Sequence, residues 1–188
     1  TGQRIGDDRL RVYLYHIPPV AVVGLTPKLV ERLFKTYPTA IAGMKDSSGD
    51  WENTKVYLDA FAKSGFDVFV GAESFLLANL RAGGVGTISA SANVNPAAIH
   101  KLYTEWQNPD AEAQQEGLNL VRDTLGRKYL MIAALKQTIA IYADDPAWTK
   151  VRPPLLELSD EQAESLESEL RQIGFTMPGL TAIDADSY

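Results

Sequence analysis

Two residues of this chain have side chains that could carry out imine chemistry together: a lysine and a tyrosine. Lys45 follows the apolar run 40–44 and precedes the polar run 46–50, so it lies where a buried strand gives way to a loop. Partial loss of hydration there disfavours the charged ammonium, and a neutral amine can attack a ketone to form a Schiff base. Tyr15 ends an earlier apolar run, and its phenol could move protons during imine formation and carbon–carbon cleavage. Either residue alone is more often structural, because most lysines are solvated and most such tyrosines pack their rings.

The elements that must position this pair alternate between strands and helices in the first half of the chain. Runs rich in apolar residues, bounded by turn residues, predict strands over 10–15, 40–44, 67–71 and 85–90, with Pro18-Pro19 stopping the first. Helices are predicted from Pro27, with Thr26 as N-cap, and over 51–63 and 74–82. This alternation is typical of βαβ units around a parallel sheet.

The second half of the chain is predicted to be helical. Its apolar periodicity indicates helices over 96–106, 110–125, 127–142 and 159–173. The last helix should begin with a capping box formed by Ser159 and Gln162, and residues 144–154 should form a loop. We therefore divide the chain into strand–helix units over residues 1–95 and a helical part over 96–188.

Four strand–helix units could form a small open sheet or half of a (β/α)8 TIM barrel. Polar residues at the ends of successive strands favour the half-barrel, since that edge is the catalytic face of such barrels: Tyr15, His16, Lys45, Asp46, Gly71, Glu73 and Ser89. We expect the second half of a barrel followed by a helical extension. Because the chain starts without Met, we also expect it to be part of a longer protein or to be completed by another chain.

Composition excludes several classes of function. A net charge of −6 without a basic cluster argues against nucleic acid as a partner. The chain has no cysteine and 2 histidines, so neither a thiolate nor a multi-histidine metal site is expected. No apolar run approaches the roughly 20 residues needed to cross a bilayer. A cytoplasmic protein that uses no metal or cofactor is consistent with these features.

Four ordered motifs resemble the dihydrodipicolinate synthase / N-acetylneuraminate lyase family. The resemblance runs from about Arg11 through the C-terminal helices. The motifs that carry it are Tyr15-His16-Ile17-Pro18, the run Gly43-Met44-Lys45-Asp46-Ser47-Ser48-Gly49-Asp50, Val70-Gly71-Ala72-Glu73, and Gly83-Gly84-Val85-Gly86-Thr87-Ile88-Ser89 with Asn93-Val94.

The resemblance implies a class I aldolase or lyase. It assigns to Lys45 the imine with pyruvate or another 2-keto acid, and to Tyr15 the proton transfers. Gly71 and Ile88 would line the keto-acid pocket, whereas Ser47 and Glu73 would face the hydroxylated tail of the substrate. The family's C-terminal helices, which residues 96–175 resemble, help to build tetramers, so we expect a homo-oligomer.

The chain also departs from the family pattern. The first four strand–helix units are absent, and with them the loop that holds the keto-acid carboxylate. His16 replaces the usual asparagine, and residues 18–23 lack the arginine that binds the aldehyde's carboxylate in the synthases. We therefore predict cleavage of a 4-hydroxy-2-keto acid or 2-keto-3-deoxy sugar acid to pyruvate and an aldehyde. Condensation of pyruvate with aspartate semialdehyde, or a non-catalytic relative that binds keto acids, are the alternatives.

Other reactive-looking residues have more ordinary interpretations. Lys136 lies in an apolar helical stretch, and such lysines usually extend their charged ends to water. Glu73 is either a pocket acid or a carboxylate that favours a helix N-terminus. Asp46 and Asp50 have the character of turn and capping residues. The glycine-rich run 83–86 precedes a strand, which is the wrong context for a phosphate-binding loop.

Overall fold

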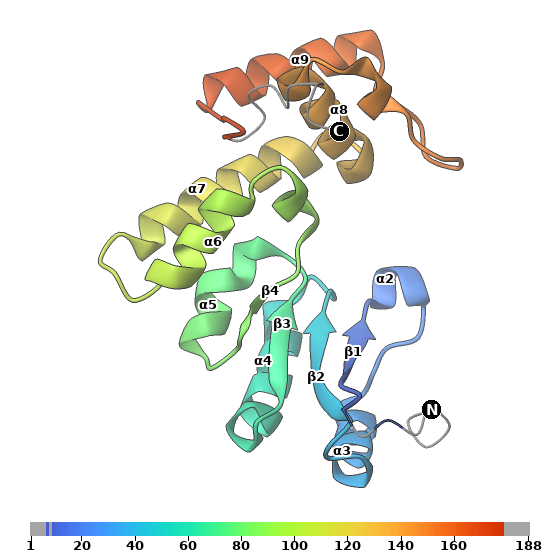
Figure 1. The fold of residues 1–188 in the computed structure, drawn as a ribbon, viewed down its shortest axis with the longest axis vertical. Coiled ribbons are helices and arrows are strands. Elements are labelled where there is room, and N and C mark those ends of the chain that lie inside the picture. Colours follow the sequence, from blue (N-terminus) through green and yellow to red (C-terminus); the bar gives the residue numbers. More distant parts are fainter. Residues whose placement is uncertain (1–6, 8, 179–188) are drawn as a thin grey trace. The chain divides into compact units, whose positions relative to one another are not determined.

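The computed structural model describes residue 7 and residues 9–178, and it divides the chain into two compact units that meet between Ser89 and Ala90 (Figure 1). The first unit holds the strands β1 (Val12–His16), β2 (Ile41–Asp46), β3 (Asp67–Val70) and β4 (Gly86–Thr87). Its helices are α2 (Pro18–Ala21), α3 (Pro27–Thr36), α4 (Trp51–Phe61) and α5 (Leu76–Arg81), with 3-10 turns at Ala62–Ser64 and Glu73–Phe75. The second unit is helical, as predicted.

The strands form one parallel sheet in the order β1-β2-β3-β4, which confirms the predicted strand–helix alternation. The register pairs Tyr15 with Lys45 and Lys45 with Phe69. Because paired residues of parallel strands point to the same face, these three side chains form one row across the sheet. The strands also differ slightly from their predicted bounds: Lys45 lies inside β2, which extends to Asp46, instead of just after the strand.

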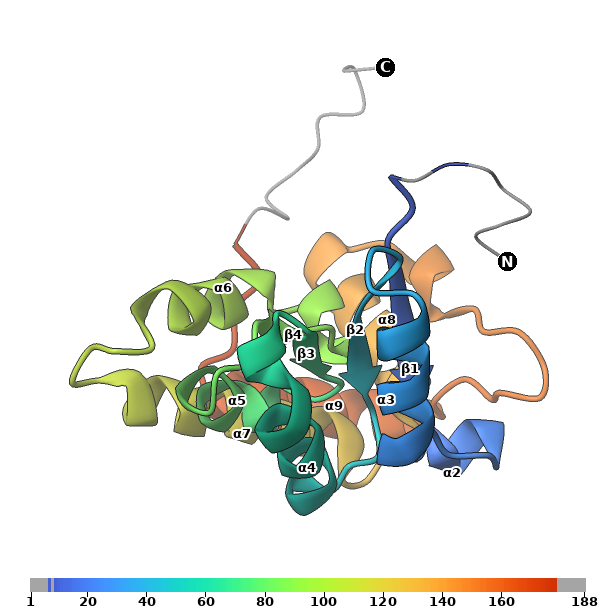
Figure 2. The same ribbon diagram turned by 90° about the horizontal axis from the view of Figure 1, so that it is seen from below.

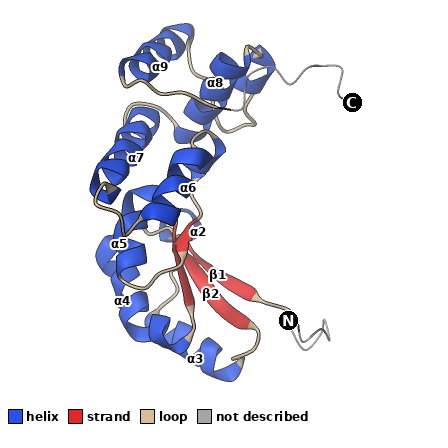
Figure 3. Cartoon of the chain, turned by 60° about the vertical axis from the view of Figure 1, so that its left-hand side comes forward, coloured by secondary structure: helices blue, strands red, loops and turns tan. Residues whose placement is uncertain are grey.

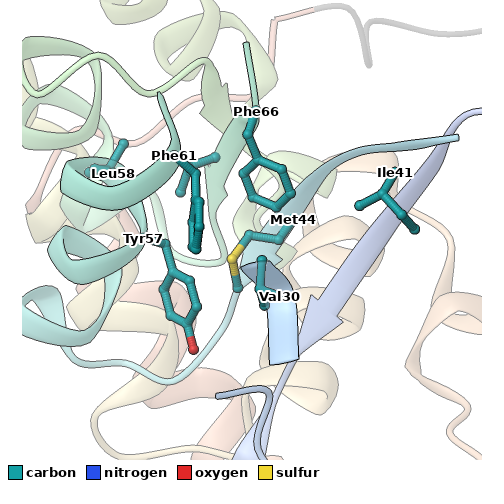
Figure 4. Close-up of a cluster of buried hydrophobic side chains, with 8 residues drawn as sticks. Val30, Ile41, Met44, Tyr57, Leu58, Phe61 and Phe66 are labelled. Carbon is teal, nitrogen blue, oxygen red and sulfur yellow. The ribbon is translucent and has the colours of Figure 1, made fainter. Parts of the chain in front are cut away.

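Alternate residues of each strand divide between a buried face and a more open face. The buried face packs against α3 and α4, which lie on the same side of the strands (Figure 3) and side by side (Figure 2). Its cluster of buried side chains, shown in Figure 4, is Val30, Ile41, Met44, Tyr57, Leu58, Phe61, Phe66 and Val68. The open face carries Tyr13, Tyr15, Lys45, Asp67 and Phe69. The two-residue period of the strands thus places core side chains on one face of the sheet and the candidate site on the other.

Helix starts follow the predicted capping chemistry. The Thr26 side chain accepts a hydrogen bond from the Leu29 backbone amide at the start of α3. In the second unit, Ser159 and Gln162 form the predicted capping box of α9 (Asp160–Gln172). These caps satisfy backbone amides that have no partner in the first turn of a helix.

Several boundaries differ from the predictions for local reasons. Pro18 begins the short helix α2 and does not simply end the strand, because proline suits the first position of a helix. The predicted helix 74–82 is a 3-10 turn followed by α5, and the predicted strand 85–90 contains only the two residues of β4. In the second unit α8 begins at Met131 instead of residue 127, because Leu130 has an extended backbone.

The second unit contains a 3-10 turn at Ala90–Asn93 followed by the helices α6 (Pro96–Glu105), α7 (Ala111–Gly126), α8 (Met131–Ala143) and α9. A further 3-10 turn, Pro146–Thr149, lies within the predicted loop 144–154. Its core joins α7, α8 and α9 through Leu125, Leu135, Leu166 and Leu170, among others. No helix in the described part of the chain combines the length and the apolar character that a membrane span requires.

Two glycines allow the packing of the sheet to be tested with matched substitutions. A Cβ at Gly43 would lie 2.3 Å from the Asp67 backbone oxygen, whereas a Cβ at exposed Gly117 in α7 would meet nothing within 4 Å. We expect Gly43→Ala to lower the free energy of unfolding by about 1–3 kcal/mol through overpacking. Gly117→Ala should instead raise it by up to about 1 kcal/mol, because alanine favours a helix. Denaturant titration of both variants measures this, and equal effects of the two would contradict the packing described.

Candidate active site

Lys45 and Tyr15 meet on the open face of the sheet, at the carboxyl ends of β2 and β1. The Lys45 amine donates a hydrogen bond of 3.2 Å to the Tyr15 hydroxyl, and the same nitrogen lies 4.4 Å from the centre of the tyrosine ring. Their strands pair these two residues directly. The Tyr15 side chain is 52% exposed and Lys45 is half-buried, so a small molecule could reach both. The structure therefore brings together the two residues that the sequence singles out.

The surroundings of Tyr15 favour its ionised form. Burial alone would raise the pKa of the phenol, but hydrogen bonds with Ser47 and Lys45, together with the positive charge of Lys45, lower that pKa below its ordinary value. Hydrogen bonds to the phenolate stabilise it relative to the neutral phenol. A tyrosine with a lowered pKa is a better general base near neutral pH than an unperturbed one.

Ser47 and Gly71 lie in contact beside this pair. The Ser47 amide donates to the His16 carbonyl, and the Gly71 amide donates to the Asp46 carbonyl, so both residues continue the ladders of the sheet beyond the strand ends. A Cβ at Gly71 would lie 2.0 Å from the Ser47 hydroxyl oxygen. Only glycine therefore lets the Ser47 side chain lie across the end of β3, where it can bond to Tyr15.

Glu73 and Ile88 occupy different environments at the same edge. The Glu73 carboxylate is 1% exposed and accepts a hydrogen bond from the Ser89 hydroxyl, so in this structure it joins two segments of the chain. Ile88 is about half exposed, and its amide donates to the Val70 carbonyl. Their contacts with substrate, like those of Ser47 and Gly71, remain predictions.

Asp46 organises the loop that carries Ser47, and its contacts fit the structural role predicted for it. This buried carboxylate accepts hydrogen bonds from the Ser48 amide at 2.9 Å, from Asn53 at 3.0 Å and from Thr54 at 2.6 Å. Asp50 caps α4 by accepting from the Glu52 amide at 3.0 Å. Both carboxylates thus fix the turn between β2 and α4.

His16, next to Tyr15, is buried on the opposite face of the sheet. Its Nδ1 accepts a hydrogen bond of 2.9 Å from the Leu25 amide, and its Nε2 lies 4.0 Å from Asp46. A Cβ at Gly24 would lie 3.2 Å from the imidazole, so the chain passes close to the ring there. His16 therefore holds the segment after β1 in place and does not reach the open face.

Three polar residues with precise contacts were missed by the sequence analysis. The amide nitrogen of buried Asn79 donates to the carbonyls of Val68 and Gly86, each at 3.0 Å, and so joins β3 to β4. On the open face the Tyr13 hydroxyl donates to the Asp67 carboxylate at 2.6 Å. The two-residue spacing of Tyr13 and Tyr15 was the available signal that both tyrosines share one face.

Lys136, the other lysine considered from the sequence, lies in the second unit. The Lys136 amine is 5.2 Å from the centre of the Trp148 ring, a cation–π contact within its own unit. Within the described ranges, residue 7 and 9–178, no three His, Cys, Asp or Glu residues gather in a way that could hold a metal ion.

Comparison with known proteins identifies the family. Residues 4–173 match the dihydrodipicolinate synthetase family. The chain belongs to this family. An uncharacterized DapA-like lyase of Chloroflexus aurantiacus is 34% identical over 164 residues, which cover 87% of this chain and 54% of the relative. A 4-hydroxy-tetrahydrodipicolinate synthase of Methanopyrus kandleri is 28% identical over 174 residues, covering 89% of this chain and 55% of that protein. The predicted family membership is confirmed.

Solved structures of the dihydrodipicolinate synthase family support the predicted fold. Dihydrodipicolinate synthase from Agrobacterium tumefaciens superposes with a TM-score of 0.76 at 29% identity, over 91% of this chain and 56% of that one. YagE of E. coli K12, solved in complex with pyruvate, superposes with a TM-score of 0.77 at 27% identity, over 89% of this chain and 57% of YagE. The chain thus spans little more than half the length of its relatives, and its four parallel strands with their helices form a partial (β/α)8 barrel.

The Lys45–Tyr15 contact can be tested through the ionisation of the phenol. We expect Lys45→Met to raise the pKa of Tyr15, because it removes a hydrogen bond and a positive charge that favour the phenolate. Phenolate absorbance of Tyr15, isolated by subtracting the spectrum of the matching Tyr15→Phe variant, should then appear at higher pH. Lys63→Met, on an exposed turn, serves as the control and should leave the titration unchanged. A titration that stays in place or moves to lower pH in Lys45→Met would contradict the contact.

Proposed function

We propose that this chain supplies the catalytic half of a class I aldolase that cleaves a 4-hydroxy-2-keto acid, or a 2-keto-3-deoxy sugar acid, to pyruvate and an aldehyde. The observation that carries the proposal is the 3.2 Å contact between the Lys45 amine and the Tyr15 hydroxyl at the carboxyl edge of the sheet. Membership of the dihydrodipicolinate synthetase family supports the class of reaction. Within this class, Lys45 is the nucleophile and Tyr15 the acid–base residue.

The reaction begins with addition of the neutral Lys45 amine to the C2 carbonyl of the keto acid. Tyr15 protonates the departing hydroxyl of the carbinolamine, and loss of water leaves a protonated imine. This imine attracts the electrons of the C3–C4 bond. When that bond breaks, the electron pair forms a neutral enamine, which is far more stable than the carbanion that cleavage of the free ketone would give.

Cleavage also requires a base for the C4 hydroxyl proton. The Tyr15 phenolate, favoured by Ser47 and Lys45, can accept that proton directly or through a water molecule, and the aldehyde then leaves. Protonation of the enamine at C3 and addition of water to the resulting imine release pyruvate and regenerate the Lys45 amine. Ser47, Gly71, Glu73 and Ile88 are proposed to line the substrate pocket.

The synthase reaction is the second candidate, because a relative that matches most of this chain is named 4-hydroxy-tetrahydrodipicolinate synthase. It condenses pyruvate with an aldehyde that carries a carboxylate, and a cation near the site would be needed to hold that group. The segment between Pro18 and Val23 contains only proline, valine and alanine, with Val20, Val22 and Val23 largely exposed. An uncharged segment of this kind favours an aldehyde without a carboxylate.

Borohydride trapping tests the nucleophile. We expect incubation with pyruvate and reduction to add the reduced adduct to the peptide that contains Lys45, as seen by mass spectrometry. Lys45→Arg should abolish this adduct, while Lys63→Arg should leave it intact. The absence of a Lys45 adduct in the unaltered protein would refute the Schiff-base proposal, and an adduct without turnover would identify a protein that only binds keto acids.

Tyr15→Phe tests the proton transfers. We expect this variant to lower kcat by about 10²–10⁴-fold, the usual contribution of an acid–base residue. Tyr37→Phe, at another exposed tyrosine, is the matched control and should retain full activity. An active Tyr15→Phe variant would assign the proton transfers to a different group.

A coupled assay decides between the two candidate reactions. Pyruvate release from 2-keto-3-deoxy sugar acids should be faster than the condensation of pyruvate with aspartate semialdehyde, measured on the same preparation. The reverse ranking would make the synthase reaction the function of this protein.

A further inference from the structure

A second polar contact lies one row away from Lys45 on the open face of the sheet. The strand register places Tyr13, Gly43 and Asp67 in one row across β1, β2 and β3. Gly43 has no side chain, and a Cβ there would lie 2.7 Å from that of Asp67. The Tyr13 phenol therefore reaches past the middle strand and donates a hydrogen bond of 2.6 Å to Asp67 Oδ2.

The Tyr13 ring also contacts the row that contains Lys45. It meets the Phe69 ring edge-on, with 5.7 Å between the ring centres, and Phe69 is the register partner of Lys45 on β3. The aromatic pair thus joins β1 to β3, the two strands that flank β2 and its residue Lys45. The hydrogen bond to Asp67, burial and the negative charge of Asp67 all raise the pKa of Tyr13, so its phenol keeps the proton that it donates.

Without Tyr13, the Asp67 carboxylate would be available to Lys45. Asp67 pairs with Gly43, two residues before Lys45, so the two charged residues are diagonal neighbours on the same face. Neighbouring strands lie about 4.8 Å apart and two residues along a strand span about 6.6 Å, so such diagonal neighbours are about 8 Å apart, within reach of a long side chain. Yet in the described part of the chain Lys45 forms no ion pair, and its amine bonds to Tyr15.

An ion pair at this position would impair imine formation. A nearby carboxylate favours the charged ammonium, and only the neutral amine attacks a carbonyl. The amine would also be drawn away from Tyr15, which performs the proton transfers. A carboxylate this close to a nucleophilic lysine is therefore unfavourable unless another group occupies it.

We propose that Tyr13 is a positioning residue that occupies the Asp67 carboxylate and so keeps Lys45 unpaired and directed toward Tyr15. This inference rests on the proposed function, since it concerns the reactivity of the same lysine. The titratable groups that the described strands present on this face are Tyr13, Tyr15, Lys45 and Asp67. Neither Gly86 nor any other residue of β4 adds a charge.

The proposal is tested by a pair of substitutions with opposite effects. Tyr13→Phe keeps the ring and its contact with Phe69 but frees the carboxylate. We expect it to slow both borohydride trapping with pyruvate and acetylation of Lys45 by acetic anhydride, about tenfold near neutral pH, since an opposite charge shifts such an equilibrium by about one pH unit or more. Adding Asp67→Asn to Tyr13→Phe removes the charge and should restore both rates.

The double variant separates this role from a merely structural one. If Tyr13 only stabilised the sheet, Tyr13→Phe/Asp67→Asn would react as slowly as Tyr13→Phe, which would overturn the proposal. An unchanged rate in Tyr13→Phe would overturn it as well. Tyr13→Phe/Asp59→Asn, which removes an exposed charge on α4, is the matched control and should not restore the rate. The pH dependence of acetylation should move to higher pH only in the variants that retain Asp67 but lack the Tyr13 hydroxyl.

The two readouts distinguish failure of this inference from failure of the proposed function. Acetylation reports the reactivity of the Lys45 amine without any keto acid. If pyruvate is not trapped but the acetylation rates follow the predicted loss and recovery, the aldolase proposal fails and the role of Tyr13 stands. If pyruvate is trapped equally well in every variant, the aldolase proposal stands and the role of Tyr13 is refuted.

Discussion

The pairing of β1 with β2 is the constraint on which the rest of the site depends. Parallel register sets Tyr15 opposite Lys45 and His16 opposite Asp46. A shift of one residue would move each side chain to the other face of the sheet and place the lysine among the apolar side chains around Met44. The buried face of the sheet fixes this register. Met44 can pack against α3 and α4 only when the alternate residues of β2, which include Lys45, point to the open face.

Small residues let the polar groups of the open face approach one another. Gly43 leaves space for the Tyr13 phenol to reach Asp67, and Gly71 leaves space for Ser47 to lie across the end of β3. In both cases a glycine leaves space for a polar side chain that comes from a neighbouring strand. Glycine weakens a strand because it has no side chain to pack. At these two positions that loss of stability accompanies the close approach of polar side chains.

The candidate pair, Lys45 and Tyr15, lies on a face of the sheet that the described residues leave partly exposed. The chain covers 56% of the dihydrodipicolinate synthase from Agrobacterium tumefaciens, and its sheet has four of the strands of a (β/α)8 barrel. Tyr13 and Tyr15 point to the face that a complete barrel encloses, and both are about half exposed here. Enclosure by further strands would lower the local dielectric and strengthen the contacts between Lys45, Tyr15, Tyr13 and Asp67.

The sequence by itself determined the order of the elements and singled out Lys45 and Tyr15 as the candidate catalytic pair. Apolar periodicity and caps such as Thr26 are local, and Lys45 and Tyr15 could be paired because each lies at the end of an apolar run in one of two consecutive strands. Only the tertiary structure decided that Tyr13 bonds to Asp67, that Ser89 bonds to Glu73, and that Asn79 joins β3 to β4. These contacts join residues far apart in the chain through the register of neighbouring strands, which no local pattern of residues encodes.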